Sequence, residues 1–204
     1  MTRSIFALLA VSLLAASARA GKYNPVLDIG DDAPAWTALS GVDGKKHSLA
    51  ALKNKDVVVL VFTCNSCPYA VDYESRLIAF AKKYAGGKVT LVAVNVNKVE
   101  QDSLPAMKKR AKMQKFNFAY LYDETQKIAH DYGATYTPEF FVLNKQRKIA
   151  YMGAMDDNPN VAKVTKLHLE TAVEALLDGK TPEVTETAAV GCLVRYERRR
   201  RKKN

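Results

Sequence analysis

The chain has 204 residues, of which 48% are hydrophobic and 25% charged, values that exclude a disordered or fibrous protein. The apolar run Ile5 to Ala18 is shorter than the roughly 20 residues that a bilayer requires, so a polytopic membrane protein is excluded as well. Three cysteines are too few for a disulfide-stapled miniprotein, and the odd number leaves at least one thiol without an intramolecular partner. We therefore expect the cysteines to serve chemistry rather than scaffolding.

Residues 1–20 have the pattern of a secretory signal peptide. Arg3 supplies a positive charge, Ile5–Leu14 an apolar stretch, and Ala18-Arg19-Ala20 a cleavage site with small residues before Gly21. No cysteine follows the apolar stretch, which argues against a bacterial lipoprotein anchor, while an uncleaved N-terminal anchor stays open. We expect an exported protein, periplasmic if the source is a Gram-negative bacterium and extracellular otherwise.

The net charge of +10 is concentrated near the end of the chain. Loss of Arg3 and Arg19 with the signal peptide reduces it to +8, and residues 195–203 hold seven basic side chains against Glu197, a net +6. The rest of the chain shows no basic face with interleaved aromatic or polar readers, so specific binding of nucleic acid is not expected. We expect one domain over residues 21–188 and a basic, flexible tail over residues 189–204. The alternative for this tail is contact with an anionic lipid or polymer.

The first half of the chain predicts a hairpin, a buried strand and a helix. Residues 21–55 are polar, and the turn Gly41-Val42-Asp43-Gly44 separates two short segments that can form a hairpin ahead of the core. Residues 56–63 (DVVVLVFT) are β-branched and apolar without alternation, which is typical of a central strand buried on both faces. Helical spacing of apolar residues predicts a helix over 68–84, stopped by Gly86-Gly87.

The second half alternates further strands with helices. Residues 89–96 predict a second buried strand, and residues 103–115 predict a basic helix that Ser103 can cap, with Pro105 in its first turn. The remaining expected elements are a strand at 119–122, a helix from Asp123 or Thr125 to Gly133, a hairpin of 140–143 and 148–152, and a helix at 161–177. This alternation predicts an α/β protein with a mixed sheet and helices on both faces.

The motif Cys64-Asn65-Ser66-Cys67 places two thiols three positions apart at a strand-to-helix junction. One helical turn can bring both sulfurs within bonding distance, which suits a reversible disulfide. The helix N-terminus is expected to lower the pKa of Cys64 below the free value of about 8.5. This makes Cys64 the candidate nucleophile, and Cys67 the thiol that resolves the mixed disulfide.

Other interpretations of the cysteines stay open. A structural zinc site needs four ligands, and Cys192 and the histidines offer neither a second CxxC pair nor an HxxxH spacing, so no metal is expected. A purely structural disulfide would form readily in an exported protein. Cys192 lies beyond the predicted core, where it is either a packed or unpaired thiol, or one that exchanges with Cys64 or Cys67 or links two chains.

Two segments resemble the thioredoxin superfamily: FTCNSCP after the buried strand and TPEFFVLN before the hairpin, with a final helix after them. The likeness covers about residues 28–180 and is to the redoxin branch, which contains AhpC/TSA-like peroxiredoxins and exported thiol-disulfide oxidoreductases. The opening DDAPAWTALSGVDGKKHSLAAL is similar to that of redoxins, and the 74 positions from Cys64 to Pro138 admit the helix-strand unit that redoxins insert. The segment FTCNSCPYAVDYESRLIAF also looks like bacterial redoxin-domain proteins with a secretory signal. The resemblance implies a thioredoxin-like fold with an N-terminal hairpin extension.

The same resemblance implies a substrate site. In the family, a cis-proline at the place of Pro138 lies against the cysteine pair, and the residue before it, here Thr137, offers its backbone to an incoming chain. We expect Thr137, Pro138, Asn65 and Ser66 to bind protein substrates whose thiols or disulfides exchange with the cysteine pair. No dissociable cofactor is required. Whether the protein reduces, oxidises or isomerises disulfides depends on its reduction potential, which the motif does not settle.

This sequence departs from the family pattern where protons are handled. Thr63 replaces the tryptophan before the first cysteine, and Val58 stands where thioredoxin has a buried acid. Exported relatives often carry a glutamate at the position of Ala70. Asp72 is therefore our candidate for the proton-handling role, against the alternative of a solvated helix charge.

Two competing functions are weighed against disulfide exchange. A peroxiredoxin-like thiol peroxidase, an antioxidant activity, requires Thr or Ser three residues before the reactive cysteine, where this chain has Val61. Its arginine on a later strand has no secure counterpart, because Arg147 falls in a predicted turn. A non-catalytic binding module with a structural disulfide, attached to a partner through the basic tail, is the second alternative.

Overall fold

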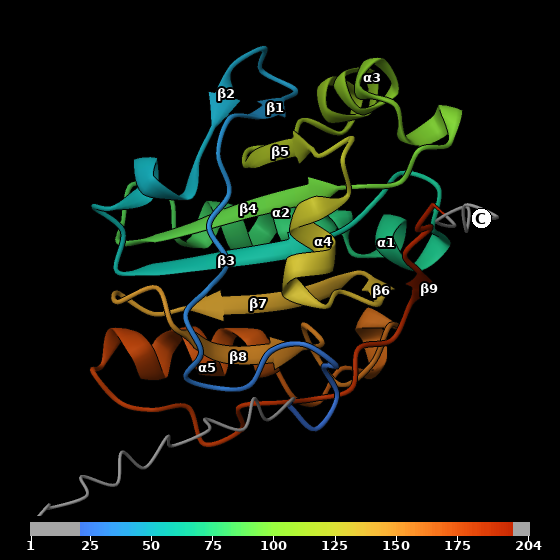
Figure 1. The fold of residues 1–204 in the computed structure, drawn as a ribbon. Helices are drawn as coiled ribbons and strands as arrows, with labels where there is room; N and C mark the ends of the chain where they lie inside the picture. The colour runs from blue at the N-terminus through green and yellow to red at the C-terminus, as the bar shows by residue number, and fades with distance from the viewer. Residues whose placement is uncertain (1–20, 198–204) are drawn as a thin grey trace, which may run out of the picture.

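Six consecutive apolar residues, Val57–Phe62, form strand β3 inside a seven-stranded sheet (Figure 1). The structure is a computed structural model and describes residues 21–197. β3 pairs in parallel with β4 (Val89–Asn95) and antiparallel with β7 (Glu139–Leu143). No residue of β3 is more than 1% exposed, which confirms the prediction of a central strand buried on both faces.

The sheet has the order β2-β1-β5-β4-β3-β7-β8. Its other strands are β1 (Leu39–Gly41), β2 (Lys46–His47), β5 (Ala119–Tyr122) and β8 (Ile149–Gly153). β3, β4 and β5 run parallel, whereas β1, β7 and β8 pair antiparallel with their neighbours. Both predicted hairpins and the short strand at 119–122 are therefore confirmed, and the sheet is mixed.

Helices cover both faces of this sheet and bury two separate hydrophobic clusters. On one face α4 (Lys127–Tyr132) packs Ile128 and Tyr132 against alternate residues of β3. The opposite cluster contains residues of α2 (Glu74–Lys83), α3 (Leu104–Gln114) and α5 (His168–Leu177). Figure 1 shows α4 in front of the sheet with α2 and α5 behind it. The predicted α/β class with a thioredoxin-like fold is thus confirmed, and α3 with β5 forms the inserted helix-strand unit.

Two predicted helices differ from the structure. The helix expected over 68–84 is divided into α1 (Pro68–Asp72) and α2, because Tyr73 between them has ψ near −11° instead of a regular helical value. The helix expected from 161 begins only at His168. Residues 161–163 form one turn of 3-10 helix, and the backbone N–H groups of Thr165 and Lys166 then donate to Asp157 instead of continuing the helix. Local hydrogen bonding of this kind competes with helix formation.

Helix ends also refine the prediction. α3 begins after Ser103 and carries Pro105 in its first turn as expected, but the Ser103 side chain makes no capping hydrogen bond. α4 ends at Tyr132, and the next residue, Gly133, has a left-handed φ of 63° that favours glycine. Its first turn is held by the Asp123 carboxylate, which accepts a bond from the Ile128 N–H.

A second, two-stranded sheet lies beside the first. It joins β6 (Tyr136–Thr137) to β9 (Cys192–Leu193), which Figure 1 shows next to α1. The expected flexible tail from residue 189 therefore includes an ordered strand, because main-chain pairing and the buried Val194 hold it in place. Residues 198–204, which hold most of the basic side chains of the tail, lie outside the described residues, as does the expected signal peptide.

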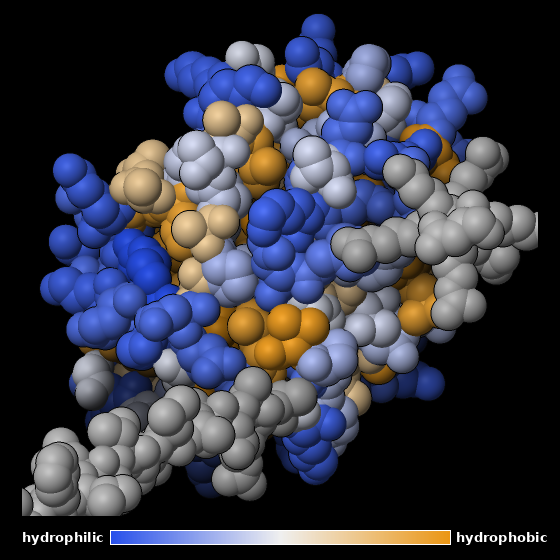
Figure 2. All heavy atoms as spheres, viewed as in Figure 1, coloured by the Kyte–Doolittle hydropathy of each residue, from blue (hydrophilic) through white to orange (hydrophobic). Residues whose placement is uncertain are grey.

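Hydrophilic side chains cover most of the face over α4, with hydrophobic groups between them in separate areas (Figure 2). Within residues 21–197, none of the helices has the length and apolar character needed to cross a membrane.

Candidate active site

Cys64 and Cys67 lie in the loop between the carboxyl end of β3 and the start of α1. Both thiols are free, and the two residues are 3% and 2% exposed. Cys67 is the residue that precedes helix α1, and Pro68 is the first residue of that helix, where a missing N–H costs no helical hydrogen bond. The predicted strand-cysteine-helix arrangement is thus present, with Cys67 rather than Cys64 at the helix N-terminus.

Thr137 contacts both cysteines, although it lies 70 or more residues further along the chain. Its hydroxyl Oγ1 is 3.5 Å from Cys64 Sγ, and its carbonyl oxygen accepts a 3.1 Å hydrogen bond from the Cys67 thiol. The Thr137–Pro138 peptide bond is cis. The structure therefore brings together Cys64, Cys67 and the Thr137–Pro138 segment, as the family resemblance implied.

The sequence analysis missed Asp102, a fully buried carboxylate beneath the cysteine loop. Asp102 Oδ1 accepts hydrogen bonds from the backbone N–H groups of Asn65 (2.6 Å) and Ser66 (3.2 Å). Asp102 Oδ2 accepts a 2.6 Å bond from the Ser66 hydroxyl. The side chain amides of Asn95 and Asn97 complete its shell, each at 3.2 Å. This one carboxylate therefore fixes the backbone of both residues between the cysteines.

The side chains of Asn65 and Ser66 also make bonds within the protein. The Asn65 side chain donates to the Gln101 carbonyl at 2.7 Å and accepts from the Tyr120 hydroxyl at 3.0 Å. The Ser66 hydroxyl donates to the Asp102 carboxylate. These contacts hold the loop, and binding of substrate by the same two residues stays a prediction. One signal could have pointed to Asp102: β3 and β4 are parallel, so the loops that follow them meet at one edge of the sheet.

The expected activation of Cys64 is wrong. Burial raises the pKa of the Cys64 thiol, and the nearby negative charge of Asp102 raises it further, against the hydrogen bonds offered by Thr137 and Ser66. The helix dipole that we expected to act on Cys64 belongs to a helix that begins four residues later, at Pro68.

Cys67 shows the opposite shift. Burial disfavours its thiolate, but the Cys192 thiol, the Ala70 N–H and the Thr137 hydroxyl can all donate to the sulfur, and together they lower the pKa of Cys67. Cys67 is consequently the member of the pair that ionises more readily in this conformation.

Asp72, our candidate for proton handling, is not brought to the cysteines. It is exposed at the end of α1, and its side chain forms no hydrogen bond or ion pair with any residue in 21–197. It lines an open pocket together with Arg76 and Pro159, and none of the three cysteines lines that pocket. The structure thus favours the alternative of a solvated helix charge.

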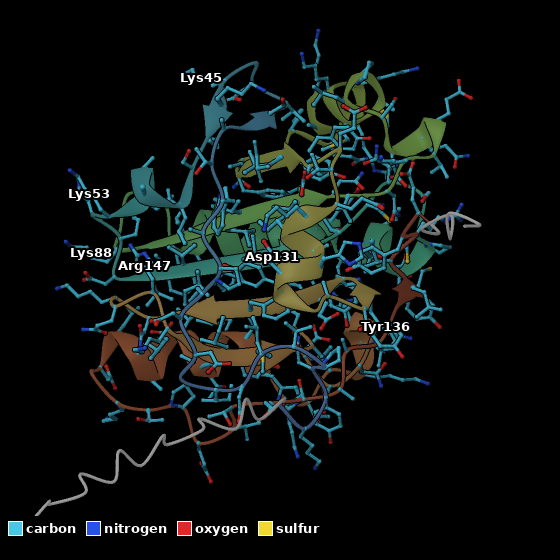
Figure 3. The ribbon with its side chains drawn as sticks, in the orientation of Figure 1. Lys45, Lys53, Lys88, Asp131, Tyr136 and Arg147 are labelled. Atoms are coloured by element: carbon cyan, nitrogen blue, oxygen red, sulfur yellow. The ribbon has the colours of Figure 1, made fainter. Side chains whose placement is uncertain are left out.

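Arg147 lies at the other end of the sheet from the cysteine site. Its guanidinium donates to the carbonyl oxygens of Leu52 and Lys55, at 2.6 and 2.8 Å, and so fastens the β7–β8 turn. Figure 3 shows Arg147 and Tyr136, the neighbour of Thr137, at opposite sides of the molecule. Arg147 therefore cannot serve as the arginine of a thiol peroxidase at Cys64 or Cys67.

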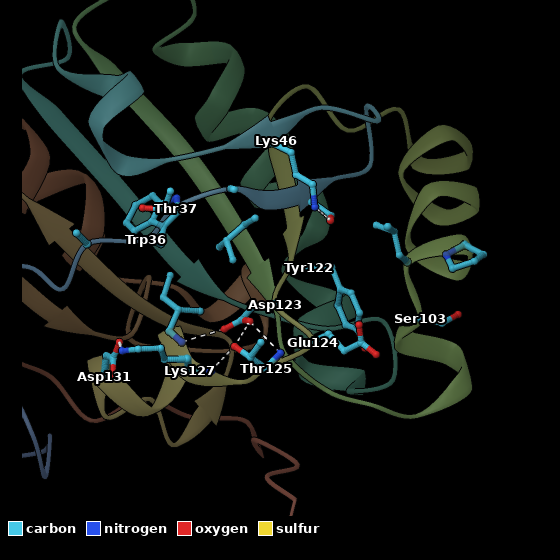
Figure 4. Close-up of a pocket in the computed structure, with 17 residues that line it drawn as sticks. Trp36, Thr37, Lys46, Ser103, Tyr122, Asp123, Glu124, Thr125, Lys127 and Asp131 are labelled. Carbon is cyan, nitrogen blue, oxygen red and sulfur yellow. Dashed lines mark hydrogen bonds and ion pairs between the residues drawn. The ribbon is translucent and has the colours of Figure 1, made fainter.

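A separate open pocket of about 760 Å³ lies between the N-terminal segment and α4 (Figure 4). Trp36, Lys46 and Tyr122 line it, together with Asp123, whose carboxylate is occupied by the N–H groups of Thr125 and Ile128. No cysteine lines this pocket, so it forms no part of the thiol site.

Comparison with known proteins agrees with this geometry. The AhpC/TSA family matches residues 29–152, more than half of the chain. The chain belongs to the AhpC/TSA family. Members of this redoxin family are generally thiol-based oxidoreductases, and the reduced cysteine pair of this redoxin accords with that chemistry.

Solved structures similar to this redoxin include proteins without an assigned activity. A hypothetical protein from Sinorhizobium meliloti 1021 is 31% identical, with a TM-score of 0.79 over 85% of this chain and 97% of its own. An uncharacterized conserved protein from Geobacillus kaustophilus is 34% identical, with a TM-score of 0.79 over 85% and 95%. A thiol:disulfide interchange protein from Chlorobium tepidum TLS shares the fold at 23% identity, with a TM-score of 0.53 over 62% and 87%. A search of curated protein sequences returns no match.

Proposed function

We propose that this redoxin is a thiol-disulfide oxidoreductase that exchanges disulfides with other proteins through Cys64 and Cys67. The observation that carries this proposal is the contact of both reduced thiols with Thr137, at 3.5 and 3.1 Å, directly before the cis-proline. Two thiols on one loop can form a disulfide reversibly, and a neighbouring extended backbone can hold a substrate chain by main-chain hydrogen bonds.

The proposed reaction transfers two electrons and two protons. A thiolate of the pair attacks one sulfur of a substrate disulfide, and the other substrate sulfur leaves as a thiol after protonation. The second cysteine of the pair then attacks the mixed disulfide, which releases the reduced substrate and leaves a Cys64–Cys67 disulfide. The reverse sequence oxidises a substrate dithiol. The lowered pKa of Cys67 supports a role for Cys67 as the attacking thiolate, in place of Cys64 as the motif alone suggested.

The function has support from relatives as well as from geometry. Membership of the AhpC/TSA family supports thiol redox chemistry, and the position of Arg147 disfavours the peroxidase branch of that chemistry. The Chlorobium tepidum protein is described as a thiol:disulfide interchange protein, which accords with the proposal. Export, which the sequence of residues 1–20 suggests, is also proposed, and sequencing the N-terminus of the expressed protein tests for cleavage before Gly21.

A redox titration tests the function. The purified protein is equilibrated in glutathione and dithiothreitol buffers of stepped potential, and mass spectrometry assigns the state of each cysteine. We expect a reversible Cys64–Cys67 disulfide with a midpoint between about −270 and about −120 mV, the range of thioredoxin-fold reductants and oxidants. A pair that never forms, or that stays oxidised well below about −300 mV, would refute exchange and favour a binding module with a structural disulfide. Rapid consumption of peroxide with no transfer to protein disulfides would instead favour a thiol peroxidase.

A further inference from the structure

The C-terminal strand β9 occupies the backbone edge that precedes the cis-proline. Cys192 and Leu193 pair antiparallel with Thr137 and Tyr136 of β6, so that Cys192 lies directly opposite Thr137. Figure 1 shows this strand between β6 and α1. An extended peptide added to a free strand edge is a common way to bind a protein chain, and here the chain that is added is the protein's own.

Gly191 allows the two backbones to approach closely. A Cβ at this position would lie 2.1 Å from the Thr137 carbonyl oxygen and 3.2 Å from the Pro138 nitrogen. Only glycine fits such an approach without displacement of the backbone. The local sequence Gly191-Cys192 therefore brings the thiol against the cysteine loop.

Residues after β9 fasten the strand to the body of the protein. The Val194 N–H donates to the Thr135 carbonyl at 2.8 Å, and Val194 itself is buried in the core. The Gln126 side chain donates to the Arg195 carbonyl and accepts from the Glu197 N–H, both at 2.9 Å. These bonds hold β9 in a fixed position beside the cysteine loop.

Cys192 lies in contact with the cysteine pair. Cys192 packs against the small cluster of Cys64, Cys67 and Ala70. The Cys192 thiol is close enough to Cys67 to help lower the pKa of Cys67, and the Tyr69 N–H in the first turn of α1 acts on Cys192 in the same way. Burial raises the pKa of Cys192 to about 11, with a further contribution from its bond to Cys67 and from the charge there. That part of the rise disappears when Cys67 is in a disulfide and carries no charge.

We propose that Cys192 is a third redox-active cysteine of this site, seated where a substrate thiol would lie, and that it forms a disulfide with Cys67 in exchange for the Cys64–Cys67 disulfide. This inference rests on the proposed function, because a substrate disulfide must first oxidise the Cys64–Cys67 pair.

The exchange step balances without any further oxidant. The Cys192 thiol loses its proton and attacks Cys67 Sγ of the Cys64–Cys67 disulfide. The Cys67–Cys192 bond forms, the Cys64–Cys67 bond breaks, and Cys64 leaves as a thiolate that takes up a proton. One disulfide and one thiol are present before and after the step, and the disulfide now ties β9 to the cysteine loop.

Single-thiol deletions test the pairing. Cys64→Ser retains Cys67 and Cys192, whereas the matched variant Cys67→Ser retains Cys64 and Cys192. Both are oxidised with glutathione disulfide, and peptide mapping without reduction measures the intramolecular disulfide in each. We expect C64S to form its disulfide about tenfold more favourably than C67S, since a contact within the fold acts as a high effective concentration. Cys64→Ala serves as a second variant for the same readout, and thermal unfolding confirms that each variant is folded.

The outcomes separate this inference from the proposed function. If C64S ends as a glutathione adduct at Cys67 with Cys192 still a free thiol, or if C64S and C67S form their disulfides equally, the third-cysteine inference is overturned. Wild-type protein in the same buffers reports on the Cys64–Cys67 couple. Should that couple cycle while C64S forms no Cys67–Cys192 bond, the proposed function stands and only the inference fails. Absence of the Cys64–Cys67 couple in wild-type protein would overturn both.

Discussion

Asp102 holds the cysteine loop through a 2.6 Å hydrogen bond from the backbone N–H of Asn65. The carboxylate is fully buried, and its negative charge raises the pKa of Cys64 in addition to the effect of burial. Asp102 therefore shapes the loop and at the same time opposes ionisation of one of its thiols. Two consequences of this arrangement can be measured separately, because geometry depends on the oxygen atoms and the pKa shift on the charge.

Replacement of Asp102 by asparagine removes the charge and keeps one acceptor oxygen for Asn65. We expect the pKa of Cys64 to fall. The pH at which Cys64 is alkylated at half its maximal rate should fall with it. The amide nitrogen that replaces Oδ2 can no longer accept from the Ser66 hydroxyl and the Asn97 side chain, so the free energy of unfolding should drop by about 1–3 kcal/mol. Residue-resolved alkylation across pH and urea unfolding measure the two effects.

Asp72→Asn is the control for this experiment, because it removes an equal charge from an exposed site on α1. We expect no change in the Cys64 midpoint and a change in stability within about 0.5 kcal/mol. A Cys64 midpoint that moved with Asp72→Asn and not with Asp102→Asn would restore Asp72 as the proton-handling group.

The thiolate of Cys67 should depend on Cys192. In the reduced protein we expect the pKa of Cys67 to lie below that of an ordinary cysteine and the pKa of Cys64 to lie above it. A Cys192→Ala substitution removes one donor to the Cys67 sulfur, so the pKa of Cys67 should rise while that of Cys64 changes little. Alkylation of each thiol as a function of pH, read by mass spectrometry, gives both midpoints. An unchanged Cys67 midpoint would show that the Cys192 thiol does not stabilise the thiolate.

Ionisation of Cys67 should also appear in stability. Because its folded pKa lies below the unfolded value, the reduced protein gains stability from this group at pH values above the unfolded pKa. This contribution is lost as the pH falls through the folded pKa. Urea unfolding of reduced wild-type protein and of Cys67→Ala over a series of pH values should therefore show a difference that grows in favour of the wild type as the pH rises.

Displacement of β9 should expose the cysteine pair. In Gly191→Ala the new Cβ meets the Thr137 backbone, so we expect the strand to shift and Cys67 to react with a neutral thiol reagent at least several times faster. Gly87→Ala is the matched control, since its Cβ would meet only the Tyr84 carbonyl oxygen at an ordinary 3.4 Å. Equal rates in wild-type protein and Gly191→Ala would mean that β9 does not shield the pair.

Asp156 is expected to be important for stability. It accepts a 2.8 Å bond from the Tyr73 hydroxyl and forms a 2.6 Å ion pair with Arg76, at the point where the predicted single helix divides into α1 and α2. Asp156→Ala leaves the Arg76 guanidinium, whose side chain is only 12% exposed, without its carboxylate, which should lower the free energy of unfolding by about 3–5 kcal/mol. Asp178→Ala breaks the exposed pair with Lys180 and should cost less than about 1 kcal/mol. Urea unfolding of both variants makes the comparison, and similar losses would contradict this view of the Asp156 cluster.

Much of the fold could be read from local patterns. The run Val57–Phe62 has no polar residue to face water, so only a strand covered on both sides can hold it, and the structure agrees. Helix α3 and strand β5 likewise follow their local periodicity closely. The late start of α5 could not be read in this way, because it depends on hydrogen bonds from Thr165 and Lys166 to Asp157, which compete with the helix.

The candidate active site also combines features that local sequence predicts with features that depend on the folded chain. The local sequence was enough to predict that Cys64 and Cys67 share a loop after a buried strand, and that Thr137-Pro138 precedes another strand, since these are properties of contiguous segments. Which thiol ionises more readily could not be predicted in this way, because a thiol's pKa depends on burial and on charges and donors that the folded chain brings from distant segments. Asp102 reaches the loop from the 3-10 turn at 100–102 that follows β4, and Cys192 reaches it on β9. Neither has a local sequence signal, since both contacts exist only once parallel strands end at a common edge and the C-terminal strand pairs beside them.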